Sequence, residues 1–253
     1  MDFRAALIEE TNAFTDVVRS VDPSTLASTP VPTCPDWNLS QLVKHVGRGN
    51  RWSAQIIEER RYEPLDPREV RDGKPPEDPE AAIAWFRQGA QLILDAIDHV
   101  GGDARVWTFI GAKPAGWWVR RRVHETTVHR ADAALALGQP FALSSELAAD
   151  GISEWLTLNV AQADRHAPPL DRGVTLHLHA TDEGLGPTGE WTITHDEDGV
   201  NWSHDHAKGE AALRGRSVDL LLALTRRRSL DEAGTEVYGD QAVWDGWLAR
   251  TPF

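Results

Sequence analysis

The sequence has almost no cysteine, since Cys34 is the only one in 253 residues. A single cysteine cannot form an internal disulfide, and it cannot build a zinc site that needs several thiolates. Long apolar runs are also absent, because no stretch approaches the ~20 residues that a membrane-spanning helix requires. The first residues, Met1 to Arg4, lack the basic and apolar segments of a secretory signal. We therefore expect a cytoplasmic protein without a membrane segment.

Positive charge is scarce as well. The chain has 26 Lys and Arg against 39 Asp and Glu, which gives a formal net charge of −13. Such a charge disfavours nucleic acids and anionic membranes as partners. The rest of the composition, with 41% hydrophobic and 26% charged residues, is typical of a folded soluble protein.

The N-terminal half contains four segments in which apolar residues recur every three or four positions, as in amphipathic helices. Proline-rich residues 30–35 and the Gly138-Gln139-Pro140 stop signal help to delimit them. Four helices of this length without a strand pattern predict a four-helix bundle over residues 1–142. The expected helices span about residues 2–20, 38–60, 83–100 and 116–137.

The hydrophobic period changes to two in the C-terminal half, which is typical of strands. Residues 174–180 and 191–194 alternate between apolar and polar, and Asp198-Gly199 is a hairpin signal. We predict a small α+β domain over residues 143–253, so the chain as a whole belongs to the α+β class. Its further elements are expected as helices near 145–160, 217–227 and 240–249, and strands near 200–202, 211–214 and 236–238.

Two potential metal ligands lie one turn apart on the fourth predicted helix. Glu125 and His129 are about 40° apart around the helix axis, on a face that also carries Arg122 among apolar residues. Charged groups on a bundle's inner face need partners or a metal. His45, at the edge of the second helix's apolar stripe, offers a third ligand, and Gly49 removes side-chain bulk beside it. These three ligands are a His₂Glu set, the kind that holds catalytic zinc with one position left open.

The proposed metal site has alternatives, both in these residues and elsewhere in the chain. Glu and His one turn apart are common on helices that bind no metal. Two other histidine groups, His177-x-His179 on a strand and His204-Asp205-His206 near a turn, are rival metal candidates. No carboxylate lies at a convincing sequence spacing from either group, so solvent-exposed faces are the expected interpretation of both.

Two motifs then resemble signatures of the mycothiol-dependent maleylpyruvate isomerase family. Residues 29–38 followed by 42–47 resemble the first signature, and residues 121–132 resemble the second, an Arg-rich turn followed by His-Glu-x-x-Val-His-Arg-x-Asp. Residues 219–240 resemble the family's C-terminal domain, so the similarity covers nearly the whole chain. The resemblance implies a DinB-like four-helix bundle joined to a sterol-carrier-protein-like α+β domain. It also implies that His45, Glu125 and His129 are the metal ligands.

The resemblance implies an enzyme that uses mycothiol and a divalent metal, with zinc as the expected ion. The only cysteine precedes the second helix, so the nucleophilic sulfur is expected from a small-molecule thiol. The metal-activated mycothiol thiolate would attack a small electrophilic substrate, and the outcome would be cis/trans isomerisation or thiol S-transfer. We expect a monomer or a weak homodimer.

Several other residues receive expected roles. The family's C-terminal domain supplies an arginine to the active site, often after a Trp-Gly pair. Here Thr225-Arg226 replaces that pair, so Arg227 is the expected catalytic arginine and Arg226 the second candidate. The residues expected to bind the cofactor are Trp37, Gly49, Trp52 and Arg122, with core packing as the equal alternative for the two tryptophans.

Two functions of other classes compete with the enzyme. In the first, the C-terminal domain carries an apolar small molecule or lipid, and the metal site is structural or vestigial. In the second, an interaction or regulatory protein uses zinc to stabilise its fold. A fourth protein ligand that closes the metal site would favour a structural role.

Overall fold

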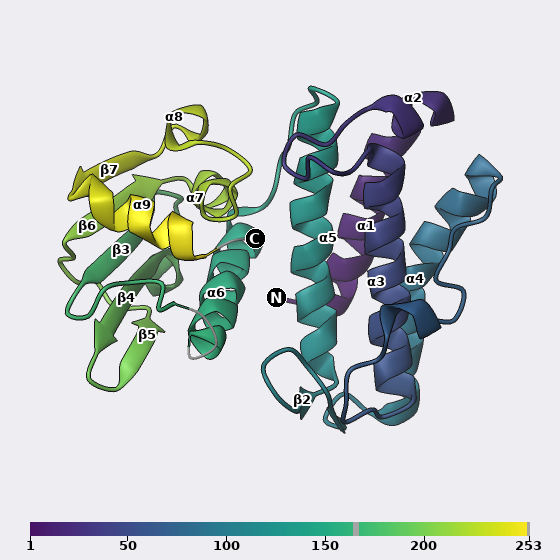
Figure 1. Ribbon diagram of the computed structural model, residues 1–253, viewed down its shortest axis with the longest axis horizontal. Helices are drawn as coiled ribbons and strands as arrows, with labels where there is room; N and C mark the ends of the chain where they lie inside the picture. The colour runs from purple at the N-terminus through teal and green to yellow at the C-terminus, as the bar shows by residue number, and fades with distance from the viewer. Residues whose placement is uncertain (164–166, 252–253) are drawn as a thin grey trace. The chain divides into compact units, whose positions relative to one another are not determined.

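A computed structural model describes residues 1–163 and 167–251 of the chain. The chain divides into two compact units, one of residues 2–141 and one of residues 142–253 together with Met1. A helical unit precedes a unit that contains a sheet, which confirms the predicted α+β class (Figure 1). The boundary expected between residues 142 and 143 lies one residue from this division.

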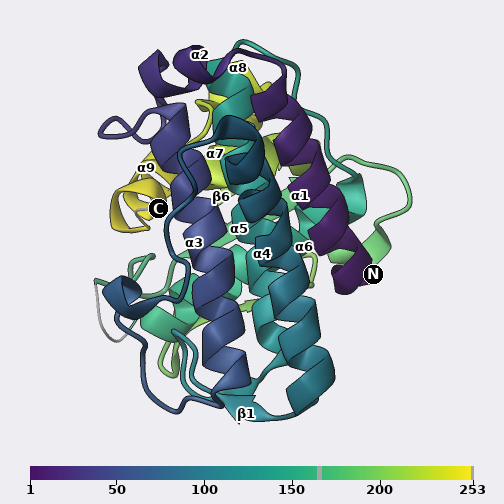
Figure 2. The same cartoon turned by 90° about the vertical axis from the view of Figure 1, so that its right-hand side faces the viewer.

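The first unit is a bundle of four long helices, as predicted, and Figures 1 and 2 show them lying side by side. Within it α3 packs against α4, and α1 packs against α5. The start of α3 is set by a capping box, in which the Asn38 side chain accepts from the Gln41 amide and the Gln41 side chain accepts from the Asn38 amide. The helices are α1 (Phe3–Arg19), α3 (Leu39–Glu58), α4 (Pro79–Val100) and α5 (Gly116–Ala136).

Four short elements join these helices, and the hydrophobic pattern predicted none of them. They are too short to show a period, and their stability comes from packing and hydrogen bonds to other parts of the unit. They are α2 (Pro23–Ser28), a 3₁₀ turn (Pro67–Glu69), β1 (Arg105–Val106) and β2 (Lys113–Pro114), the last two of which pair as an antiparallel hairpin.

The second unit is a five-stranded sheet with the strand order β5-β4-β3-β6-β7. Strand β3 pairs in parallel with β6, and the other pairings are antiparallel. The predicted hairpin signal Asp198-Gly199 does join two adjacent strands. The elements are α6 (Ser145–Gln162), β3 (Thr175–Ala180), a 3₁₀ turn (Gly186–Gly189), β4 (Glu190–Asp196), β5 (Gly199–Ser203), β6 (Ala211–Gly215), α7 (Ser217–Leu224), α8 (Leu230–Ala233), β7 (Glu236–Gly239) and α9 (Gln241–Arg250).

One face of this sheet forms the core of the second unit. Leu176 and Leu178 of β3 and Trp191 of β4 are fully buried in a cluster with residues of the helices, including Trp244 and Trp247 of α9. Because side chains alternate along a strand, the residues between them lie on the opposite face. That face carries polar side chains. Among the helices of the described residues, none is long and apolar enough to cross a membrane.

Candidate metal centre

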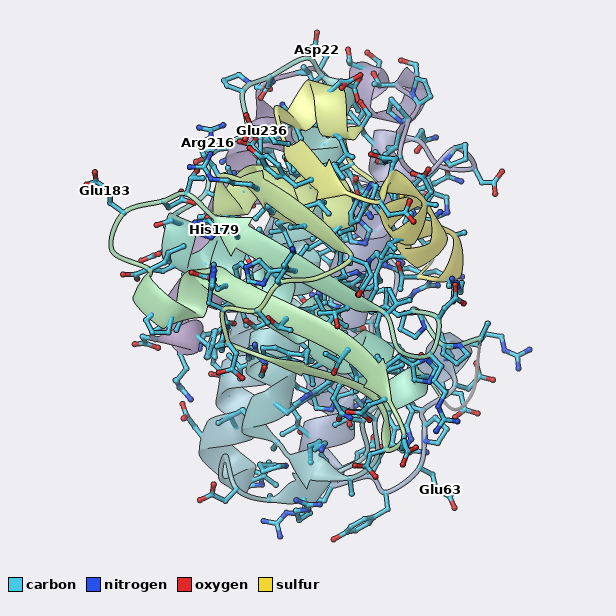
Figure 3. The ribbon with its side chains drawn as sticks, turned by 90° about the vertical axis from the view of Figure 1, so that its left-hand side faces the viewer. Asp22, Glu63, His179, Glu183, Arg216 and Glu236 are labelled. Atoms are coloured by element: carbon cyan, nitrogen blue, oxygen red, sulfur yellow. The ribbon has the colours of Figure 1, made fainter. Side chains whose placement is uncertain are left out.

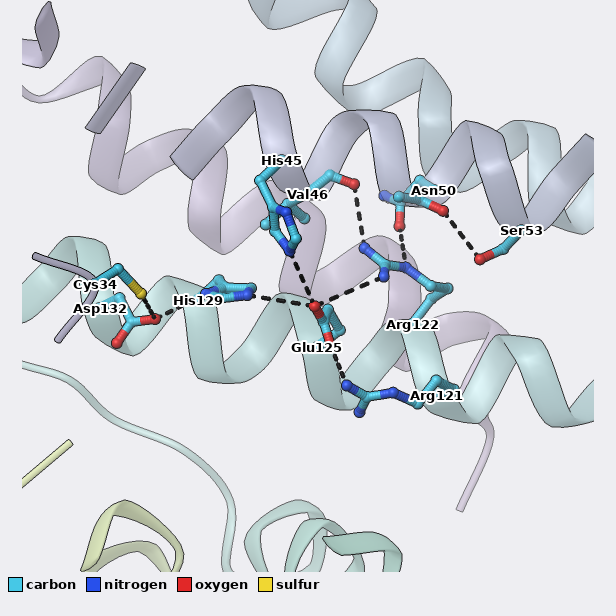
Figure 4. A network of polar contacts seen from close by, with 11 residues as sticks. Cys34, His45, Val46, Asn50, Ser53, Arg121, Arg122, Glu125, His129 and Asp132 are labelled. Atoms are coloured by element: carbon cyan, nitrogen blue, oxygen red, sulfur yellow. Dashed lines mark hydrogen bonds and ion pairs between the residues drawn. The ribbon is translucent and has the colours of Figure 1, made fainter. Parts of the chain in front are cut away.

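The three predicted ligands meet between α3 and α5 (Figure 4). The Nε2 atom of His45 lies 3.2 Å from Oε1 of Glu125, and Nε2 of His129 lies 3.3 Å from the same oxygen. One ligand atom from each of the three residues lies within 4.8 Å of the other two. Around a tetrahedral zinc, bonds of ~2.0–2.1 Å place neighbouring ligand atoms ~3.3 Å apart. The donors therefore fit a zinc-sized ion, and we call these three residues the bundle cluster.

Glu125 is an ionised carboxylate in this setting. Burial alone would raise its pKa, but the Arg121 guanidinium and the two imidazoles outweigh that effect and hold the pKa well below its usual range. Arg121 pairs with Oε2 of Glu125 through an i,i+4 contact on α5. The other oxygen, Oε1, is the one that faces both histidines. The carboxylate thus keeps a negative charge and presents one oxygen to a cation.

His129 is oriented by a carboxylate on its far side. Its Nδ1 lies 2.7 Å from Oδ2 of Asp132, while the Thr33 hydroxyl donates to Oδ1 of the same aspartate at 2.6 Å. Burial lowers the pKa of His129, but Asp132 and Glu125 on either side raise it above its ordinary value. This aspartate contact directs Nε2 towards Glu125, an arrangement common for histidines that bind metals. A neutral His129 ring that keeps its proton on Nδ1 beside Asp132 has the lone pair of Nε2 available for a metal.

His45 and Trp37 form the more open side of the cluster. Burial lowers the pKa of His45, so its imidazole is mostly neutral at pH 7 and has a lone pair available. The Trp37 ring lies 4.6 Å from the His45 ring and 6.2 Å from the His129 ring, measured between centroids. Trp37, expected to bind the cofactor, therefore lies directly beside the bundle cluster.

Arg122 and Gly49 act together next to the cluster. Arg122 is buried, donates to Oδ1 of Asn50 and to the Val46 carbonyl, and places Nη1 4.0 Å from Oε1 of Glu125. A Cβ atom at Gly49 would lie 2.8 Å from the Arg122 guanidinium. Gly49 therefore leaves space for this arginine. The binding of a cofactor by either residue stays a prediction.

Trp52 lies in an aromatic group formed with the β1–β2 hairpin. Its ring packs against Trp107, Phe109 and Trp118 at centroid distances of 5.3 to 5.6 Å, and its Nε1 donates to the Leu65 carbonyl. The loop that carries Trp107 is therefore packed against α3 and α5. No ring contact joins Trp52 to the described residues of the bundle cluster.

Sequence reasoning did not single out Thr33 or Asn50. Thr33 holds Asp132 from the loop before α3, and Asn50 holds Arg122 from within α3. Asn50 carried a detectable signal, since it is a polar residue on the apolar stripe of its helix. Thr33 carried none, because its partner lies 99 positions away in the sequence.

Cys34 lies beside Asp132, the carboxylate that contacts Nδ1 of His129. Its Sγ is 4.0 Å from Oδ2 of Asp132, and Cys34, His129 and Asp132 form a second possible donor group. This group shares only His129 with the bundle cluster.

The structure also distinguishes the two candidate arginines of the second unit. Arg226 follows α7 with a φ of +61°, a left-handed conformation that favours glycine. The Arg226 amide donates to Ala223 and the Arg227 amide to Leu222, which is the Schellman pattern at a helix end. Arg226 thus stands where a Trp-Gly pair would place its glycine. Arg227 is buried and its Nη1 donates to the Thr225 carbonyl, but a catalytic role for either residue stays a prediction.

The rival histidines gave a result that the sequence did not suggest. Glu190 lies opposite His179 across β3 and β4, and His177 is buried, so the expected interpretation as a solvent-exposed face is wrong for His177. His177, His179, Glu190 and His206 offer ligand atoms within 4.8 Å of one another, and we call them the sheet cluster. The glutamate was missed because cross-strand pairing depends on register. His204 is not part of this group, since its Nδ1 contacts the Glu190 backbone carbonyl at 2.7 Å.

Both units match models of one protein family. The model of the mycothiol maleylpyruvate isomerase N-terminal domain matches residues 7–134, and the model of the MDMPI C-terminal domain matches residues 146–246. Two uncharacterised proteins from strains of Mycobacterium tuberculosis are each 26% identical to the chain over 147 residues, which is 56% of this chain and 71% of theirs.

Two solved structures resemble the whole fold. They are crystal structures of the mycothiol-dependent maleylpyruvate isomerase and of its histidine-to-alanine mutant, both with a TM-score of 0.60. The sequence identities are 13% and 12%, and the match covers 90% of this chain and 89% of each of those chains. At such low identity the likeness shows the fold.

Proposed function

The chain belongs to the mycothiol maleylpyruvate isomerase family, and from that premise we propose that it is a metal- and mycothiol-dependent enzyme acting on a small electrophile. The proposed reaction is cis/trans isomerisation of a maleylpyruvate-like compound or transfer of the thiol to the substrate. The observation that carries the proposal is the convergence of His45, Glu125 and His129 on one point. A cytoplasmic location and a monomeric or weakly dimeric state stay predictions.

The donor set favours a catalytic role over a structural one. Among the residues that the structure describes, no fourth His, Cys, Asp or Glu has a ligand atom within 4.8 Å of all three donors. Catalytic zinc sites typically have three protein ligands and an open position, whereas structural zinc sites are closed by four. The bundle cluster therefore has the composition expected of a site that admits an external ligand.

In the proposed enzyme, each residue around the metal has a separate role. His45, Glu125 and His129 hold the metal, and Asp132 keeps His129 oriented through Nδ1. When bound, a divalent metal, with zinc the expected ion, stabilises the thiolate of a thiol such as mycothiol at neutral pH.

Two arginines and a tryptophan complete the surroundings. Arg121 and Arg122 keep Glu125 ionised and fixed. Trp37 covers the imidazoles of His45 and His129 on one side, where it limits access of water.

Arg227 is proposed to bind an anionic group of the substrate, a carboxylate or a developing enolate. The proposal for this residue rests on the family resemblance and on its position directly after the left-handed Arg226. An Arg227→Lys variant keeps the charge and loses the bidentate geometry. We expect it to raise KM for a carboxylate substrate more than it lowers kcat.

The deciding experiment uses the full chain, stripped of metal and reloaded with zinc. Mycothiol is supplied with maleylpyruvate and with a panel of other small electrophiles, and NMR follows both the substrate and the thiol. Isomerase activity would convert substrate without net loss of thiol, whereas S-transfer would consume one thiol for each product. A matched control is His99→Asn, because His99 is an exposed histidine near the end of α4.

Three results would overturn the proposal. One is folded, zinc-loaded protein that neither converts any electrophile nor consumes thiol. Another is turnover that persists without metal or without thiol. The third is a His129→Ala variant that retains both zinc and full activity, since His129 is central to the donor set.

A further inference from the structure

The face of the sheet opposite the apolar core carries a group of histidines. His177 and His179 are two positions apart on β3 and so lie on the same face, away from the buried Leu176 and Leu178. Figure 3 shows His179 on this face. Polar residues on an exposed strand face are ordinary, and a site requires that further donors come to the same point.

Two further donors arrive from different segments. Glu190 begins β4 and is the cross-strand partner of His179, with its Oε1 3.7 Å from His179 Nδ1. Its Oε2 lies 3.2 Å from His177 Nε2 and 2.5 Å from Nδ1 of His206. His206 belongs to the segment that follows β5. Three imidazoles from two segments thus surround one carboxylate.

The orientation of His177 is set by a hydrogen-bond chain. The Thr192 hydroxyl donates to the Asp205 carbonyl at 2.6 Å, so its single hydrogen is used there. Nδ1 of His177 lies 3.2 Å from the same hydroxyl oxygen and must supply the hydrogen of that contact. Nε2 is then the unprotonated nitrogen of the neutral ring. It is buried within the cluster and makes no aligned hydrogen bond to a residue that the structure describes.

This arrangement is the one that metal-binding histidines adopt, in which one ring nitrogen binds an outer partner and the other faces the ion. We infer that His177, His179, Glu190 and His206 form a second divalent metal site, of the type that takes zinc. The inference does not depend on the function proposed for the bundle cluster. Nitrogen-rich donor sets with one carboxylate suit zinc and neighbouring transition metals better than magnesium or calcium.

Zinc binding would require the longest separations between ligand atoms to shorten, and the 2.5 Å separation between His206 Nδ1 and Glu190 Oε2 to lengthen. The ligand atoms lie within 4.8 Å of one another, and a tetrahedral zinc needs them ~3.3 Å apart. The His206 side chain is 74% exposed, so it has room to turn inwards, whereas His177 is already held. The neighbouring cation, Arg214 on β6, has its guanidinium near Glu236 at 3.5 Å, which offsets part of its charge.

Four protein donors would close the coordination of the ion, which is the pattern of a structural site. Two of its ligands come from β3, one from β4 and one from the segment after β5. The bound ion would hold that segment, near residues 204–206, against the sheet. Hydrogen bonds from Thr192 and His204 already bring it there, so the ion would strengthen an existing contact.

The test measures zinc stoichiometry on the full chain after removal of all metal with a chelator. Zinc is titrated against a chromophoric competitor, and cobalt(II) absorption reports four-coordinate geometry. The variant is His179→Asn with His206→Asn, which leaves the buried His177 in place. The control is His99→Asn, and circular dichroism checks that each protein is folded.

We expect the double substitution to remove one equivalent of tightly bound zinc, with about a hundredfold weaker binding or more at that site, because changes to outer-shell partners alone cost ~10–100-fold. The control variant should keep the wild-type stoichiometry. In a His45→Ala and His129→Ala background, one equivalent should remain, and the double substitution should remove it. This background separates the sheet cluster from the bundle cluster.

A second measurement does not rely on counting ions. Zinc should slow amide hydrogen exchange of residues 204–210 in the wild-type chain and leave the exchange unchanged in the double variant. The inference fails if the folded wild-type and double-variant proteins bind the same number of zinc ions with the same affinity. It also fails if the background lacking the bundle ligands binds no zinc while remaining folded.

Discussion

The bundle cluster and the sheet cluster each gather imidazoles around one glutamate, yet they are built in opposite ways. The bundle cluster has three donors on two helices, and its central histidine, His129, is only 4% exposed. The sheet cluster has four donors on two strands and a connecting segment, and its outermost histidine, His206, is 74% exposed. The outer partner of the oriented histidine also differs, since His129 faces the Asp132 carboxylate and His177 faces the Thr192 hydroxyl.

These differences indicate what each site is suited to do. A set of three donors on two helices, with His129 buried and His45 on a more open side, suits a site that keeps a position for an external ligand, as catalytic zinc sites do. A closed set of four donors near the surface has no such position and instead connects segments of the chain. Similar residues therefore support different proposed roles at the two clusters.

The largest expected effect is on turnover. His129→Ala should remove a metal ligand and lower mycothiol-dependent turnover by about 100-fold or more, because second-shell changes alone cost ~10–100-fold at metal sites. The His179→Asn and His206→Asn double variant should keep turnover within about twofold of wild type, because its ligands belong to the other cluster. Steady-state kinetics of the zinc-loaded proteins makes the comparison. Equal losses in both variants would contradict the division of roles.

The next largest effect is expected on zinc affinity when Asp132, which contacts Nδ1 of His129, is changed. Asp132→Asn removes the charge that orients the imidazole, and we expect zinc affinity at the bundle cluster to fall by ~10–100-fold. Competition titration with a chromophoric chelator measures the change. Asp16→Asn, at an exposed position of α1, is the matched control and should have no effect. Unchanged zinc affinity in the folded Asp132→Asn variant would show that the Asp132 carboxylate does not contribute to zinc binding at the bundle cluster.

Acid should weaken metal binding at the bundle cluster. The groups that face His129 are Glu125 and Asp132 on α5, His45 on α3 and Cys34 in the preceding loop, and the two carboxylates raise its pKa. Above that pKa the ring is neutral and binds metal without losing a proton. Below it each metal ion displaces one proton, so affinity should fall by about tenfold per pH unit as the pH decreases.

Zinc titrations between pH 6 and 8.5 in the Asp132→Asn background give the matching control, because the pKa of His129 should be lower there. The same affinity at every pH in that range in the wild-type chain would mean that the metal-free His129 imidazole is already neutral, with its single proton on Nδ1.

The smallest effect is expected at the sheet cluster. Thr192→Val removes a neutral hydroxyl that orients His177, and zinc affinity there should fall by about tenfold or less, at the lower end of second-shell effects. The loss should be smaller than for Asp132→Asn, because a hydroxyl polarises an imidazole less than a carboxylate does. Titration in the His45→Ala and His129→Ala background isolates this site. A larger loss than that of Asp132→Asn would reverse the comparison.

Much of the fold could be predicted because it depends on local patterns. The four long helices show a period near 3.6 and recognisable end signals, and the strands β3 and β4 show a period of two. The helix α2 was not predicted because six residues are too few to show a helical period, and β1 and β2 were not predicted because two residues cannot show alternation. The sequence identified Arg226 as a candidate arginine but not its left-handed conformation, because that conformation depends on how α7 ends.

The sequence by itself determined the helical and sheet halves and the spacing of Glu125 and His129 on one helix face, since each depends on residues a few positions apart. Only the tertiary structure decided which distant residues meet them. His45 reaches Glu125 across 80 positions, and Thr33 reaches Asp132 across 99. Glu190 meets His179 through strand register, and His206 meets both through the path of the chain after β5. Such contacts depend on packing and register, which the whole core specifies and no local pattern records.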